Sequence, residues 1–137
     1  MTTLERPDLR LARTSLQYAI DYGWTTEVRG ARLVFGSSTH VVGIAVPSAD
    51  FSPLVTHLSA HRLSYPVLRL PERPADLVFL ATTHTLAAAP WPLVDVALPP
   101  SHTESGPVTW VVPPRRSPNP VPALTTLLAA MRSQSGR

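Results

Sequence analysis

The chain has no cysteine and no lysine, and only 15% of its residues are charged. Without cysteine it can form no disulfide, no zinc–thiolate site and no cysteine nucleophile, which fits a reducing cytoplasm. All twelve basic residues are arginines, and nine acidic residues leave a net charge of +3. The basic isoelectric point therefore reflects arginine chemistry more than a strong positive field, and it supports nucleic-acid binding only weakly.

Long apolar runs and paired carboxylates are also missing. No run approaches the roughly 18 residues of a membrane-spanning helix, and the N-terminus lacks the basic start and apolar centre of a signal peptide. We therefore expect a cytoplasmic protein with no membrane partner. The nine acids are scattered, with no Asp-x-Asp or Asp-x-Glu, and there is no glycine-rich phosphate loop. These absences argue against two-metal, ATPase and dinucleotide chemistry, and we expect no cofactor and no metal site.

At 137 residues the chain has the length of one domain. We expect a mobile leader over residues 1–7, a single domain over 8–133 and a frayed tail over 134–137. Helical periodicity and capping residues predict three helices. They run from Asp8 to Tyr22, from Asp50 or Ser52 through about His61, and from about Val121 to Arg132. In the first helix we expect one broad buried face made of Leu9, Leu11, Leu16, Tyr18, Ala19 and Tyr22.

Alternating and all-apolar runs predict the strands. They are a hairpin over 24–29 and 32–35, a buried strand over 40–46 that should be central, an antiparallel pair over 65–70 and 76–81, and two runs over 94–98 and 108–112. The predicted fold is α+β, a mainly antiparallel (mixed) sheet of about six to seven strands covered by about three helices.

The segment from Val94 to Pro114 is the most distinctive part of the sequence. Two β-branched runs each end at a proline pair and flank a polar loop, so we expect them to form a hairpin closed by prolines. The loop contains Ser101, His102 and Thr103, followed by Gly106 and Pro107. Its side chains could bind an anion or cap their own backbone, and self-capping is the usual role of short polar side chains.

The run Leu98–Pro114 has the form Leu-Pro-Pro-Ser-x-Thr-x-x-Gly-Pro-Val-x-Trp-x-Val-Pro-Pro and resembles actinobacterial bifunctional DNA primase/polymerase-like (prim-pol-like) domains. The segment Tyr18–Trp24 resembles the end of their N-terminal helix. Active members hold two Mg²⁺ ions with an acidic pair on a strand. The corresponding strand here, Thr39–Val46, has no carboxylate. The resemblance therefore implies a relative that is not an enzyme.

Candidate nucleic-acid-binding residues cluster in the last third of the chain. Arg115 and Arg116 follow Trp110, and an arginine pair beside an aromatic side chain suits single-stranded nucleic acid. Arg69 and the loop residues Ser101, His102 and Thr103 would extend this platform. The alternative is that Trp110 packs in the core, the arginine pair is a solvated turn, and Arg69 pairs with Asp76.

Two other constellations invite catalytic interpretations. His57 and His61 have the helical spacing of metal ligands, but no glutamate follows His57 and no third ligand is evident, so one surface and one half-buried histidine are expected. Ser101 and His102 with Asp95 suggest a hydrolase, but adjacent side chains point apart and there is no nucleophile elbow.

These observations predict a non-catalytic, prim-pol-like accessory or regulatory module that binds nucleic acid. The alternative is a protein-interaction module, acting as a homodimer or on another chain, with no nucleic-acid role. The high apolar fraction of 44% and the modest charge favour the alternative.

Overall fold

The computed structural model describes residues 2–36, 40–83, 93, 96–116 and 120–135. Within these residues the chain forms one α+β domain with antiparallel sheets, as the sequence predicts. The elements are α1 (Thr2–Tyr22), β1 (Thr26–Arg29), β2 (Arg32–Phe35), β3 (Val41–Pro47), the 3-10 turn η1 (Ser48–Asp50), α2 (Phe51–Ala60), β4 (Val67–Arg69), β5 (Asp76–Thr82), β6 (Ala97–Leu98), β7 (His102–Thr103), β8 (Gly106–Pro107), β9 (Thr109–Val112) and α3 (Leu124–Ser135).

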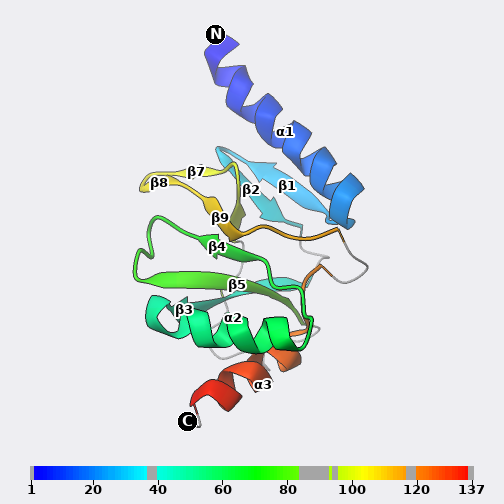
Figure 1. The fold of residues 1–137 in the computed structure, drawn as a ribbon. Helices are drawn as coiled ribbons and strands as arrows, with labels where there is room; N and C mark the ends of the chain where they lie inside the picture. The colour runs from blue at the N-terminus through cyan, green and yellow to red at the C-terminus, as the bar shows by residue number, and fades with distance from the viewer. Residues whose placement is uncertain (1, 37–39, 84–92, 94–95, 117–119, 136–137) are drawn as a thin grey trace.

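The strands are divided among three sheets rather than joined in one. The order is β1-β2-β6 in the first, β3-β5-β4-β9 in the second, and β7-β8 form a small hairpin. The predicted β1–β2 hairpin and the predicted β4–β5 pair are both confirmed. Figure 1 shows the four-stranded sheet in the middle of the molecule, with α1 and the first sheet on one side and α2 and α3 on the other.

Two apolar cores lie on the two faces of the four-stranded sheet. Alternate residues of β5 face opposite ways, as the pleat requires: Val78 and Leu80 enter the first core, whereas Leu77 and Phe79 enter the second. The first core packs against α1 and the first sheet through Leu11, Tyr18, Trp24, Leu33 and Phe35. The second core packs against α2 and α3 through Leu54, Leu58, Leu124, Leu127 and Ala130.

Helix α1 starts at Thr2, so the predicted start at Asp8 was wrong. The residues before Asp8 include Leu4, Glu5 and Arg6, which favour helix, so Asp8 lies inside α1 and not at its start. The predicted buried face was also too broad. Leu11 and Tyr18 are buried and Tyr22 is half-buried, whereas Leu9, Leu16 and Ala19 on that predicted face are exposed.

The two β-branched runs of the Val94–Pro114 segment do not pair with each other. Strand β6 pairs with β2 in the first sheet, while β9 pairs with β4 in the second. The intervening loop forms its own hairpin, β7–β8, and prolines end the flanking strands, so the runs can enter different sheets. The predicted hairpin between them is therefore wrong.

Strand β3 lies at the end of the four-stranded order and not in its centre. Its outer edge is partly covered at one point, because the amides of Gly43 and Leu93 each donate to the other's carbonyl, at 2.8 and 2.7 Å. Both faces of β3 are nevertheless covered, which explains why its sequence is nearly all apolar.

The second and third helices are close to their predictions. Asp50 is at the N-cap of α2 but makes no side-chain cap bond, and α3 begins at Leu124 rather than near Val121. No helix in the described part of the chain is long and apolar enough to cross a bilayer. His84, Trp91 and Asp95 lie outside the described residues.

Candidate functional site

The two loop hydroxyls that could have bound a ligand are buried and serve the fold. The Oγ atom of Ser101 accepts a hydrogen bond from the amide of Leu33 at 2.7 Å. The hydroxyl of Thr103 donates to the carbonyl of Gly106 at 3.0 Å and accepts from the amide of Ser105 at 3.2 Å. Thr103 therefore caps its own turn, as the self-capping interpretation predicts, whereas Ser101 joins the loop to β2 across 68 residues.

His102 is exposed and lies beside a turn that sequence reasoning did not connect with it. Its amide donates to the carbonyl of Ala31 at 3.1 Å, in the turn between β1 and β2. The residues that flank this turn, Arg29 and Arg32, are opposite each other across the two strands, and Glu27 forms an ion pair with Arg29 at 3.4 Å. This proximity depends on tertiary packing, so no local pattern could reveal it.

Trp110 belongs to an aromatic group in the first core. Its ring lies near those of Tyr18 and Trp24, with centroids 6.4 and 6.3 Å away, and its Nε1–H donates to the Tyr18 hydroxyl at 3.3 Å. That hydroxyl donates in turn to the carbonyl of Pro99 at 2.6 Å. Burial raises the pKa of Tyr18 to about 12. Trp110 is half-buried and held in place, so it offers limited area for stacking.

Arg115 and Arg116 lie at the C-terminal end of α1. Arg116 forms an ion pair with Asp21 at 2.9 Å, although its side chain is 74% exposed. The Tyr22 hydroxyl donates to the carbonyl of Pro114 at 3.4 Å. These contacts place an exposed arginine pair next to a half-buried tyrosine, and Asp21 offsets part of the positive charge.

Arg69 lies far along the sheet from the arginine pair. It is opposite Thr109, the first residue of β9, whereas Arg115 and Arg116 follow the last residue of that strand. Asp76 pairs with Arg73 at 3.8 Å and not with Arg69. Arg69 and the arginine pair are thus at opposite ends of β9 and do not form one continuous platform.

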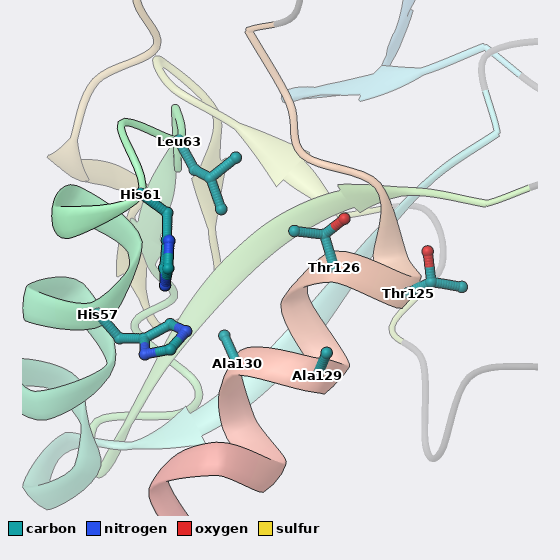
Figure 2. Close-up of a pocket in the computed structure, with 7 residues that line it drawn as sticks. All are labelled: His57, His61, Leu63, Thr125, Thr126, Ala129 and Ala130. Carbon is teal, nitrogen blue, oxygen red and sulfur yellow. The ribbon is translucent and has the colours of Figure 1, made fainter.

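The described residues contain no cluster of three or more metal-ligating side chains. His57 is half-buried and His61 is exposed, as predicted. Their rings border a groove of about 510 Å³ between the end of α2 and the facing side of α3 (Figure 2).

An apolar stripe on α1 is the surface feature that the sequence did not reveal. Leu9, Leu16 and Ile20 are 55%, 63% and 70% exposed. At 3.6 residues per turn they fall within a narrow strip of the helix, opposite the buried Leu11 and Tyr18. We call these three residues the outer stripe. Figure 1 shows the N-terminal part of α1 extending beyond the strands beneath it.

Comparison with known proteins adds no assignment. No protein-family model matches this chain, and neither the curated proteins nor the solved structures contain a match.

Proposed function

We propose that this protein is a non-catalytic binding module that docks a helix of another protein on the outer stripe of α1. The observation that carries the proposal is the exposure of Leu9, Leu16 and Ile20 along one line of a helix. Single exposed apolar residues are common, but an aligned set on an otherwise well-packed domain is typical of an interaction surface. An apolar strip on one helix suits the apolar face of a second helix.

The charges beside the outer stripe define the partner. Arg13 borders the stripe, Arg10 lies further round the same side, and Ala12 and Ala19 border the other side; all four are exposed. Residues 9–20 include no acidic residue. The complementary partner is therefore an amphipathic helix whose apolar face is flanked by Asp or Glu.

A second copy of this chain fits the same surface poorly. In an antiparallel pair that sets Leu9 against Ile20, the two Arg13 side chains come to the same border within about one helical turn of each other. Such a juxtaposition of like charges opposes association. We therefore expect a monomer that binds a different chain.

Binding to a designed helical peptide tests this proposal. The probe is a fluorescein-labelled peptide of about 20 residues with leucines at helical spacing and glutamates on both flanks, and its control carries lysines instead of glutamates. We expect the acidic peptide to bind more tightly by about tenfold or more, since each 1.4 kcal/mol of complementarity is a factor of ten. Equal binding of both peptides would contradict the proposal. A solution mass near twice 14.9 kDa would indicate that a second copy of this chain, and not a different protein, covers the outer stripe.

The proposal that the protein is not an enzyme rests on the absence of acidic residues from β3. No carboxylate lies on β3, the strand where the prim-pol-like resemblance would place the metal-binding pair. Primer extension above background with Mg²⁺ or Mn²⁺ would overturn this part. The outer-stripe proposal would survive that result, because it depends on different residues.

Nucleic-acid binding is the second candidate function. It is favoured by the exposed Arg115–Arg116 pair beside the half-buried Tyr22, and by the resemblance of Leu98–Pro114 to prim-pol-like domains. Anisotropy with labelled single- and double-stranded oligonucleotides at two salt concentrations tests it. Arg115→Ala/Arg116→Ala should weaken binding and flatten the salt slope by about one unit for each lost phosphate contact. Arg73→Ala is the matched control, and an equal effect of the control would reject the arginine pair as the site.

A further inference from the structure

The imidazoles of His57 and His61 both line the groove between α2 and α3. Their spacing in the sequence alone did not indicate this groove. His57 is in the last turn of α2 and His61 is its C-cap residue. Figure 2 shows both rings over the same groove, facing one another, with Thr125, Thr126 and Ala130 of α3 along the opposite wall. We propose that this groove binds one divalent transition-metal ion through the rings of His57 and His61.

The separation of the rings suits chelation. Their centroids are 4.6 Å apart and their planes are inclined at 60°. With metal–nitrogen bonds of about 2.0–2.1 Å, two imidazoles on one ion hold their centroids roughly 4.5–5 Å apart at a bond angle of about 90–110°. Small side-chain rotations would therefore be enough to direct one nitrogen of each ring to a shared ion.

The end of α2 holds the histidine pair in place and favours a cation. The amide of Leu63 donates to the carbonyl of Leu58, and the amide of Arg62 donates to that of Ser59, both at 3.0 Å. Arg62 adopts a left-handed φ of 57°, so the helix ends in a Schellman motif that fixes the backbone at His61. The partial negative charge at a helix C-terminus stabilises cations near the last turn.

The ligand set indicates which metals would bind. Imidazole nitrogens suit Cu²⁺, Ni²⁺ and Zn²⁺, whereas Mg²⁺ and Ca²⁺ prefer oxygen ligands. No third histidine, cysteine or carboxylate completes a cluster in the described residues. The other coordination positions would be filled by water or an added ligand, because Figure 2 shows the hydroxyls of Thr125 and Thr126 pointing away from the histidine rings. Affinity should follow the Irving–Williams order, with Cu²⁺ tightest.

Metal titration of the full chain, purified without a histidine tag, tests the site. We expect calorimetry to give one Cu²⁺ or Ni²⁺ per chain, with no binding of Mg²⁺. In amide NMR spectra, paramagnetic Cu²⁺ should broaden the signals of the last turn of α2 and of residues 125–130. His57→Gln and His61→Gln should each weaken binding by about tenfold or more, in line with the loss of one metal ligand.

His40→Asn is the matched control, because His40 is exposed outside the groove and asparagine tolerates its left-handed φ of 55°. It should leave the affinity unchanged. His61 is exposed, so His61→Gln should remain folded and carries the test even if His57→Gln does not. Unchanged binding in folded His61→Gln, broadening elsewhere, or no bound ion would overturn the proposal. The outcome is independent of peptide binding at α1.

Discussion

The buried polar residues of the Leu98–Pro114 segment, Ser101 and Thr103, stabilise the fold and are not exposed to a ligand. The polar loop of this segment suggested a ligand-binding site in the sequence. In the structure Ser101 is fully buried, and its Oγ atom accepts a hydrogen bond from the amide of Leu33 in β2. Hydrogen bonds of this kind join segments that are distant in sequence, here across 68 residues. Ser101 therefore has a structural role in this segment, because it links the loop to β2.

Ser101→Ala should destabilise the protein, and His102→Ala should not. The serine substitution leaves the buried amide of Leu33 without an acceptor, which costs about 1–3 kcal/mol. His102 is exposed, and its contact with Ala31 uses only the backbone, so its replacement should change the free energy of unfolding by less than about 0.5 kcal/mol. Urea unfolding followed by circular dichroism measures both. Similar stability of the two variants would contradict the assigned role of Ser101.

Tyr18 should make stability depend on pH in the alkaline range. Its pKa is about 12 in the folded protein, raised mainly by burial, against 10.0 for the ordinary side chain. Because the folded pKa is the higher one, the stabilising contribution is complete below pH 10 and is lost as the pH rises to about 12. The chain has no lysine, so few other groups titrate in this window.

The measurement is the urea midpoint of the wild type and of Tyr18→Phe between pH 8 and 12, together with tyrosinate absorbance. The wild-type midpoint should fall above pH 10, and the fall should be smaller in Tyr18→Phe. Tyr18→Phe should also be less stable at neutral pH, because the carbonyl of Pro99 and the indole of Trp110 lose their partner. The same alkaline fall in both proteins would show that another group causes it.

At the scale of elements, α1 has two apolar faces with different roles. The inner face, with Leu11 and Tyr18, packs in the first core, and the outer stripe faces away from the body of the protein. Sequence periodicity merged the two into one broad face, because leucines at positions 9, 11 and 16 are alike in hydropathy. The structure distinguishes the two faces, because α1 contacts β1 and β2 along one side only, which buries Leu11 and Tyr18 and leaves the outer stripe exposed.

The two faces should respond differently to substitution. Leu11→Ala should lower the free energy of unfolding by about 2–5 kcal/mol, as expected for a buried leucine. Leu16→Gln/Ile20→Gln should change it by less than about 1 kcal/mol, because surface substitutions away from packed features have small effects. Chemical denaturation distinguishes the two. A large loss in the double variant would mean that the outer stripe packs within the protein.

Local patterns predicted the elements better than their arrangement. The β1–β2 hairpin and the β4–β5 pair are joined by short turns, so period-two alternation and turn residues were sufficient. The partners of β6 and β9 and the edge position of β3 depend on contacts between distant segments, which no local pattern records. For the same reason the His57–His61 spacing was visible in the sequence, while the groove formed by α3 was not.

At the scale of the whole molecule, the four-stranded sheet contributes to both cores. Strand β5 alone contributes Val78 and Leu80 to one core and Leu77 and Phe79 to the other. Neither core can be lost while the other keeps its full set of partners, so the described structure should unfold as one unit.

Coincident transitions test this cooperativity. Tryptophan fluorescence, which includes Trp24 and Trp110 of the first core, should give the same urea midpoint as circular dichroism, which follows the whole backbone. Leu127→Ala, in the second core, should shift both midpoints equally. Two separate midpoints would mean that the cores are independent.

The most direct test of the proposed function is a paired titration of three proteins: wild type, Leu16→Gln/Ile20→Gln and Arg115→Ala/Arg116→Ala. Each is titrated with the acidic helical peptide and with a single-stranded oligonucleotide, and anisotropy is measured. Peptide binding should weaken by about tenfold in the α1 variant, through loss of roughly 1.4 kcal/mol of apolar burial, and should be unchanged in the arginine variant. Oligonucleotide binding that depends on the arginine pair, with no peptide binding by the wild type, would contradict α1 docking and establish the second candidate instead.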